Sequence, residues 1–213
     1  MRLTLTTFLT IDGVMQSPGA PDEDRAGGFE HGGWLVPLAD DGMGAAMTRW
    51  FAQADAFLLG RSTYEIFASH WPQVPDDNPI AAALNTLPKY VVSTTLDSPD
   101  WQGSTVIGSD VMDTIAALKA RPGRELQVHG SGQLAQALIA HGLIDEYRLL
   151  VFPVYVGAGR RLFADPVLTG SLRLLQSNTT DTGVLLLTYE PAGSLGHGSF
   201  AFAPEPSEHR ILR

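Results

Sequence analysis

A strand that passes through a glycine-rich turn directly into a helix constrains this chain most. Residues 126–129 form a short apolar run, 130–132 read Gly-Ser-Gly, and 133–139 have helical apolar spacing that Gly142 is expected to end. Such a turn leaves backbone N–H groups open to an anion, and residues 130–135 fit the pattern G-x-G-x-x-G/A. A tight turn with no ligand explains the pattern equally well.

Composition limits the classes of protein to consider. A chain of 213 residues with 44% apolar content can form one large or two small domains. The net charge of −9 disfavours a nonspecific nucleic-acid binder, and the absence of cysteine excludes disulfides, thiolate metal sites and a cysteine nucleophile. The N-terminus lacks a signal-peptide pattern and no run of about 18 apolar residues occurs. We therefore expect a cytoplasmic protein with no membrane partner.

The order of predicted elements indicates an α/β fold closed by antiparallel strands. The predicted strands cover residues 2–9, 56–59, 89–93, 104–107, 126–129, 145–156, 172–175 and 184–189. The predicted helices cover residues 43–54, a segment from Ser62, 78–84, a segment capped by Asp110, and 133–139. Residues 1–190 are expected to form one domain. Residues 191–213, rich in Gly, Pro, Ser and His, are expected to be a loosely ordered or docked extension.

Two segments before the glycine turn carry candidate functional groups. The long loop over residues 16–42 holds Phe29–Trp34, which includes Glu30 and His31 and is a candidate lid, because loops of this length are usually functional. Ser62-x-x-Glu65 fits a capping box, which sets Arg61 beside a helix N-terminus and suits a phosphate. Pairing of Arg61 with a nearby carboxylate is the competing interpretation.

Further candidates flank the first and last parallel strands. Asp12 is the acid we would name as proton donor or substrate orienter, although an Asp-Gly turn explains it as well. The glycine-rich loop 156–163 holds Arg160 and Arg161, which fit either an anion site or exposed surface arginines. His129, at a strand end, is expected to be packed or hydrogen-bonded rather than a metal ligand.

The order and spacing of these motifs resemble the dihydrofolate reductase-like family. Asp12-Gly13 follows the first strand, Gly60-Arg61-x-Thr63-Tyr64-Glu65 opens a helix and Ser93-Thr94 ends a strand. Val128-His129-Gly130-Ser131-Gly132 then meets a helix, and Pro153 to Gly159 precedes Leu162-Phe163. The resemblance spans about residues 2 to 190 and is closest to the branch of the reductase domain of the bifunctional riboflavin-biosynthesis deaminase–reductase and its stand-alone relatives.

That resemblance implies a mostly parallel sheet of about eight strands flanked by helices, with hydride transfer from NADPH to a small substrate. The implied contacts to the adenosine side are Gly60, Arg61, Ser62, Thr63, Ser93 and Thr94. The implied pyrophosphate turn is Gly130, Ser131, Gly132, Gln133 and Leu134. Asp12 and Gly13 would lie beside the nicotinamide, whereas Glu30, His31, Trp34, Arg160 and Arg161 are the candidates for the substrate.

Several departures and alternatives remain. Residues 43–54 contain no acid of the kind that engages a pteridine, which puts dihydrofolate in doubt, and no deaminase zinc motif is present. A serine hydrolase is disfavoured because His129 stands where the G-x-S-x-G motif needs glycine, and no histidines form an i, i+4 pair for a metal. A nucleotide-binding module without turnover is the main alternative. A homodimer is expected, with the strand 147–156 as its edge.

Overall fold

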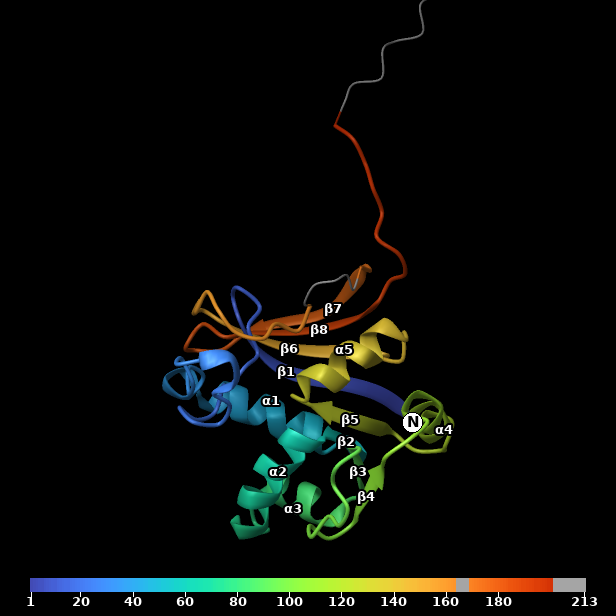
Figure 1. The fold of residues 1–213 in the computed structure, drawn as a ribbon. Helices are drawn as coiled ribbons and strands as arrows, with labels where there is room; N and C mark the ends of the chain where they lie inside the picture. Colours follow the sequence, from blue (N-terminus) through green and yellow to red (C-terminus); the bar gives the residue numbers. More distant parts are fainter. Residues whose placement is uncertain (164–168, 201–213) are drawn as a thin grey trace, which may run out of the picture.

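The computed structural model describes residues 1–163 and 169–200 and is built on one eight-stranded sheet. The strand order is β4-β3-β2-β5-β1-β6-β8-β7 (Figure 1). The strands are β1 (Arg2–Thr10), β2 (Ala54–Gly60), β3 (Lys89–Val92), β4 (Ser104–Ile107), β5 (Glu125–His129), β6 (Glu146–Phe152), β7 (Leu172–Thr179) and β8 (Leu185–Pro191). Strands β1 to β6 pair in parallel, and β8 runs antiparallel to β6 and β7. The predicted mostly parallel sheet with antiparallel C-terminal strands is confirmed.

Helices cover both faces of this sheet (Figure 1). They are α1 (Asp41–Phe51), α2 (Arg61–His70), α3 (Pro79–Thr86), α4 (Val111–Lys119) and α5 (Gly132–Ala140), with the short 3-10 helices η1 (Ala26–Gly28), η2 (Val36–Leu38) and η3 (Trp71–Gln73). Buried residues of α4 and α5 share one apolar cluster with the sheet, and those of α1, α2 and α3 share another. No helix in the described ranges is long and apolar enough to span a membrane.

The two faces of β1 differ in chemistry because side chains alternate along a strand. Leu3, Leu5 and Leu9 join the cluster under α4 and α5, as the alternation predicts. Thr4 and Thr6 point to the opposite face, where they are buried beside polar residues of β5 and β6. A polar patch inside the sheet is therefore covered by the α1 layer.

One predicted helix cap is wrong, and a second is right in position only. Helix α2 begins at Arg61 with Gly60 at its N-cap, so Ser62 is inside the helix and makes no capping box with Glu65. Asp110 does occupy the N-cap of α4, with a φ of 46°, but its side chain makes no capping hydrogen bond. The N-cap of α1 is Asp40, whose carboxylate accepts the Met43 N–H at 2.8 Å, so this helix starts two residues before the prediction.

The predicted dimer edge is also wrong. Strand β6 ends at Phe152, before Pro153, and is hydrogen-bonded to β1 on one side and β8 on the other. An interior strand has no unpaired backbone to offer a second chain. The homodimer stays a prediction, and a second copy would have to meet another surface.

The predicted loop has more definite structure than the sequence pattern implied. Residues 16–42 include η1 and η2, and Phe29 and Trp34 are buried in the core rather than exposed on a lid. Residues 192–200 have no helix or strand and lead away from the sheet (Figure 1). The rest of the expected extension, residues 201–213, lies outside the described residues.

Candidate functional site

A cavity of about 1200 Å³ opens at the carboxyl ends of the parallel strands, where ligands bind in open α/β sheets. Its walls include β1, the ends of β2, β3 and β5, the first turns of α2 and α5, part of α1, part of the segment 15–26, and the loop 160–161. Thirteen of the predicted site residues line it: Gly60, Arg61, Ser62, Thr63, Ser93, Thr94, Gly130, Ser131, Gly132, Gln133, Leu134, Arg160 and Arg161. Asp12, Gly13 and Trp34 do not line this cavity, nor do Glu30 and His31.

The Gly-Ser-Gly turn is locked to the start of α2. Gly130 and Ser131 both adopt left-handed backbone conformations, with φ of 52° and 51°. This is costly for Ser131, but three hydrogen bonds hold it there. Its Oγ accepts the Gly60 N–H at 3.0 Å and donates to the His129 carbonyl at 2.9 Å, and its N–H donates to Thr63 Oγ1 at 3.1 Å. The hydroxyls of Thr63 and Ser131 therefore build the turn.

Consequently, the turn offers backbone groups rather than side chains to a ligand. The first N–H groups of an α-helix have no partner within the helix, and helices α2 and α5 both begin at the cavity wall. A side chain in place of Gly132 would put its Cβ 3.1 Å from the Met15 sulfur, so only glycine fits here without displacing Met15. Two positive helix ends at one narrow turn suit a phosphate-bearing ligand.

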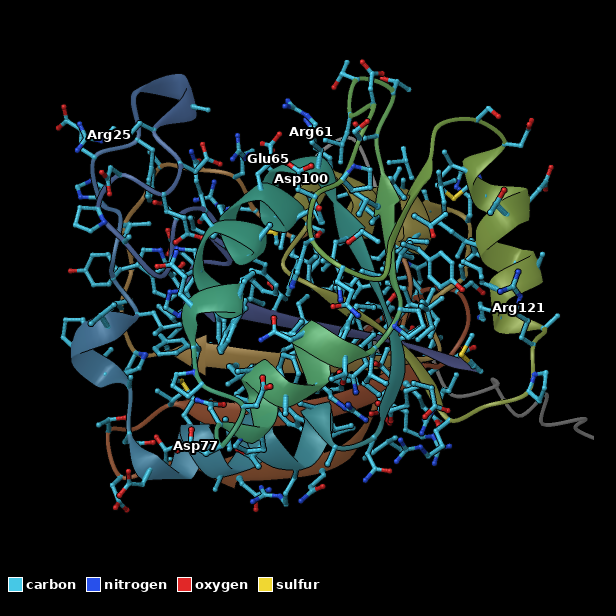
Figure 2. The ribbon with its side chains drawn as sticks, turned by 90° about the horizontal axis from the view of Figure 1, so that it is seen from below. Arg25, Arg61, Glu65, Asp77, Asp100 and Arg121 are labelled. Atoms are coloured by element: carbon cyan, nitrogen blue, oxygen red, sulfur yellow. The ribbon has the colours of Figure 1, made fainter. Side chains whose placement is uncertain are left out.

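Arg61 adds a positive side chain at the same end of the cavity. Its guanidinium donates to Glu65 at 3.0 Å across one helical turn, and both side chains are 49% exposed (Figure 2). The competing interpretation, in which this arginine pairs with a carboxylate, is thus the one that the structure shows. An exposed i, i+4 pair of this kind contributes only about 0.3–0.5 kcal/mol to stability. The Arg61 guanidinium can therefore exchange Glu65 for a phosphate at little cost.

Asp12 has a different environment from the one expected of a proton donor. Its carboxylate accepts hydrogen bonds from Thr10 Oγ1 at 2.6 Å and from the backbone N–H of Gly157 at 2.9 Å, and it pairs with Arg161. The Thr10 hydrogen bond, with those from the backbone, lowers the pKa of Asp12. The carboxylate is therefore ionised near neutral pH and fastens the loop after β6 to the turn after β1.

The two arginines of that loop reach the cavity while holding acidic partners. Arg160 pairs with Asp24, and Arg161 donates to the Asp12 carbonyl at 2.9 Å. Their side chains are 49% and 40% exposed, and both line the cavity. Both guanidinium groups can therefore contact an anionic group of a substrate with only a small side-chain movement.

Glu30 and His31 lie at a second, smaller hollow of about 350 Å³. This hollow shares Gln16, Ala26 and Arg160 with the large cavity, so the two are neighbours. Trp34 is buried, donates its indole N–H to the Gln16 carbonyl at 2.9 Å and packs edge-on against Phe152. Trp34 therefore anchors the loop over residues 16–42 to the core.

A buried chain of polar side chains beneath α1 is the main feature that sequence reasoning missed. Arg148 makes two hydrogen bonds to Glu125, at 2.6 and 3.0 Å, and one to Glu146 at 2.7 Å. Glu125 accepts from Gln127 at 2.6 Å, and Gln127 contacts His129 at 3.1 Å. The signal was present in the sequence, because polar residues recur at every second position, at 125, 127 and 129 in β5 and at 146 and 148 in β6.

His129 ends this chain at the cavity wall and is held neutral. Its ring is buried and stacks on Phe51 with ring centroids 4.4 Å apart, as expected of a packed, hydrogen-bonded histidine. Burial, with a contribution from the charge on Arg148, lowers the pKa of His129 to about 3. The imidazole therefore carries no charge at physiological pH.

This neutral histidine is expected to make stability fall as the pH drops below neutrality. The unfolded chain takes up a proton at His129 near pH 6.5 whereas the folded chain does so only at about 3, so stability present above pH 6.5 is lost on going down through this window. Between pH 6 and 5 the loss approaches about 1.4 kcal/mol per pH unit. Urea unfolding at pH 7, 6 and 5 measures it. A His129→Leu variant should show a flatter profile, and parallel profiles would contradict the assignment.

Comparisons with known proteins agree with this fold and place the chain in a family. A family model described as the RibD C-terminal domain matches residues 2–186. The uncharacterized protein YyaP of Bacillus subtilis (strain 168) is 26% identical over 191 residues, which cover 88% of this chain and 94% of YyaP.

Solved structures of similar fold include the following three proteins. A putative riboflavin biosynthesis protein from Shewanella sp. PV-4 superposes with a TM-score of 0.67 at 23% identity, covering 90% of this chain and 99% of its own. The deaminase/5-amino-6-(5-phosphoribosylamino)uracil reductase of Thermotoga maritima gives 0.59 at 15% identity, covering 89% of this chain and 56% of its own. Dihydrofolate reductase from Enterococcus faecalis, complexed with NADP(H), gives 0.58 at 14% identity, covering 90% and 96%. The resemblance drawn from the sequence motifs is thereby confirmed: the chain has the dihydrofolate reductase-like fold and belongs to the RibD C-terminal domain family.

Proposed function

We propose that this protein is an NADPH-dependent reductase that transfers a hydride to a C=N or C=O group of a small heterocyclic or carbonyl substrate. The observation that carries the proposal is the junction of two helix N-termini, α2 and α5, locked together by Ser131 at the wall of a large cavity. The family supports it, and the Enterococcus structure of the same fold contains NADP(H). When bound, the cofactor supplies the hydride, and the chain supplies binding, orientation and exclusion of water.

The residues of the cavity fit such a cofactor. The N–H groups of Gly132, Gln133 and Leu134 would hold the pyrophosphate at the start of α5. Arg61, with Ser62 and Thr63, would meet the phosphate on the adenosine ribose, which distinguishes NADPH from NADH. Ser93 and Thr94 line the cavity at the end of β3 and would flank that ribose.

The rest of the cavity lining suits a small, partly apolar substrate. Met15, Met47 and Phe51 line it, and α1 contributes no carboxylate to the lining, in line with the doubt about dihydrofolate. Arg160 and Arg161 would bind an anionic group of the substrate. Asp12 and Gly13 would position the Arg161 loop, whereas Glu30 and His31 would reach a substrate only from the smaller hollow.

A nucleotide-binding module without turnover is the second candidate. Two observations favour it. The pKa of Asp12 is lowered. The carboxylates of Glu23, Asp24 and Glu65, which line the cavity, are engaged by the Gly19 N–H, Arg160 and Arg61 respectively. A hydride acceptor also needs a proton, which the Asp12 carboxyl, with its lowered pKa, does not readily give. Oxidation of NADPH in the presence of a panel of imines and carbonyl compounds separates the two candidates.

Arg61→Ala is expected to weaken NADPH binding by about 10- to 30-fold and NADH binding by less than about threefold, because it removes charge-assisted hydrogen bonds that only the additional phosphate can accept. Titration calorimetry or fluorescence measures both dissociation constants. The exposed pair with Glu65 contributes little to stability, so the melting temperature should not change by more than about 2 °C.

Arg121→Ala is the matched control, since Arg121 is an exposed arginine at the far side of the molecule, bonded to Tyr90 (Figure 2). It should leave both dissociation constants unchanged. Equal losses for NADPH and NADH in Arg61→Ala would place the additional phosphate elsewhere. Failure of the unaltered protein to bind either cofactor would overturn the reductase proposal.

A further inference from the structure

The floor of the large cavity contains a buried hydroxyl with no partner. Thr6 is 2% exposed, and its Oγ1 has no hydrogen bond to any of the residues that the structure describes. The parallel register sets Thr6 of β1 beside His129 of β5, and both residues line the cavity. Buried polar groups nearly always have partners. Three buried hydroxyls among the described residues have none, those of Thr4, Thr6 and Ser104, and only Thr6 belongs to the cavity lining, so a ligand there is the partner open to it once its side chain turns toward the cavity.

The hydrogen-bond chain behind His129 decides which of its nitrogens is available. Gln127 donates its amide nitrogen to the Trp50 carbonyl and to the Glu125 carboxylate, both at 2.6 Å. Its amide oxygen therefore faces His129 and must accept, so Nε2 of the imidazole carries the proton. That leaves Nδ1 as an acceptor, and within residues 1–163 and 169–200 nothing donates to it.

The orientation of the imidazole is fixed as well as its tautomer. The ring stacks on Phe51 at an interplanar angle of 21°, and Phe51 is itself part of the cavity wall. Glu125, at the other end of the chain, is held by two hydrogen bonds from Arg148 and cannot turn to accept elsewhere. Thr6 and His129 thus present one hydroxyl and one neutral acceptor side by side.

We propose that Thr6 and His129 bind the edge of a planar amide, in which Nδ1 of His129 accepts the amide N–H and the Thr6 hydroxyl donates to the adjacent carbonyl oxygen. Two molecules could bring such an edge: the carboxamide of the nicotinamide ring, or a ring amide of the substrate. This inference rests on the proposed reductase function for what fills the cavity, and it adds the recognition chemistry at its floor.

The Thr6→Val variant tests whether Thr6 and His129 bind an amide, with Thr4→Val as the matched control. Thr4 has the same unpartnered hydroxyl on the same face of β1 but does not line the cavity. Replacing either hydroxyl by a methyl group should leave the melting temperature equal to or above that of the unaltered protein. Only Thr6→Val should weaken binding of the amide, by about tenfold, and Thr6→Ser should restore it.

Two sets of probes distinguish the sources of the amide. If the cofactor brings it, Thr6→Val weakens NADPH but not adenosine 2′,5′-bisphosphate, which lacks the nicotinamide. If the substrate brings it, NADPH binding is unchanged, and 2-pyridone binds to the NADP⁺-loaded protein whereas N-methyl-2-pyridone, without the N–H, does not. The ¹⁵N shift of His129 Nδ1 should move with whichever probe binds.

The inference is overturned if Thr6→Val binds NADPH as tightly as Thr4→Val and 2-pyridone binds no better than its N-methyl form. That result leaves the reductase proposal intact. Failure of the unaltered protein to bind NADPH or adenosine 2′,5′-bisphosphate would instead contradict the reductase proposal, while the 2-pyridone comparison on the free protein would still test the pair.

Discussion

Replacing Arg148 by methionine is expected to cost about 3–5 kcal/mol in the free energy of unfolding and to lower the melting temperature by about 10 °C. The side chains of Arg148, Glu125 and Glu146 are 6%, 10% and 7% exposed, so these charges interact with little screening by water. Removing the arginine leaves two buried carboxylates that lose their central partner. Urea and thermal unfolding, followed by circular dichroism, measure the change.

A double variant separates the loss of the partner from the loss of packing. In Glu125→Gln with Arg148→Met, the uncompensated carboxylate of Glu125 is gone, and Glu146 keeps its exposed partner Arg2 at 2.9 Å. We expect the double variant to recover at least about half of the lost stability. Additive losses in the two single variants would show that Glu125 and Arg148 do not depend on each other, contrary to the geometry.

The contrast between the buried pair and the exposed ones explains why the network matters beyond stability. Arg61 and Glu65 form an exposed pair that is free to rearrange for a ligand, whereas Arg148 and Glu125 form a fixed support. The hydrogen bonds continue from Glu125 through Gln127 to His129. They therefore fix the orientation of the His129 imidazole at the cavity wall.

Much of the fold could be predicted from the sequence because its signals are local. The alternation over residues 2–9 and the helical spacing over 133–139 each require only neighbouring residues, and they match β1 and α5. Asn78 before Pro79 likewise marks the start of α3, where its side chain accepts two backbone N–H groups. Thirteen site residues line one cavity because strand ends and helix starts of a parallel sheet meet on one side.

What could not be predicted depends on contacts between segments distant in sequence. The placement of β6 between β1 and β8 is a property of strand order, so Pro153 near its end gave a false indication of an edge. Glu65 was expected to cap α2, but Arg61 four residues earlier attracts its carboxylate, and the Ser131 turn takes the Gly60 N–H. The position of Thr6 beside His129, on which its proposed role depends, appears only once β1 is seen to pair with β5.

The two helix N-termini at the cavity have a direct electrostatic consequence. A carboxylate at the start of an α-helix stabilises the helix by about 0.3–1 kcal/mol, yet the same carboxylate repels a phosphate that needs the same position. Gln133 is an exposed residue in the first turn of α5 and lines the cavity. It is therefore the position where folding and cofactor binding should respond in opposite directions to one added charge.

Gln133→Glu is expected to weaken binding of both NADPH and NADH by about 30-fold while leaving the melting temperature unchanged or raised. Two like charges about 8 Å apart at an effective dielectric constant of about 20 repel by about 2 kcal/mol, which corresponds to that loss of affinity. Both cofactors lose affinity because both carry the pyrophosphate, in contrast to Arg61→Ala, which acts on NADPH. Titration of each cofactor, with thermal unfolding of the same samples, gives the two readouts.

Two controls make the result specific. Gln133→Ala removes the amide without adding charge and should bind both cofactors within about threefold of the unaltered protein. Gln102→Glu adds the same charge at an exposed position that does not line the cavity, and it should leave binding unchanged. Normal cofactor binding by Gln133→Glu would show that the pyrophosphate does not bind at the start of α5. The Gly-Ser-Gly turn would then be only a tight connection between β5 and α5.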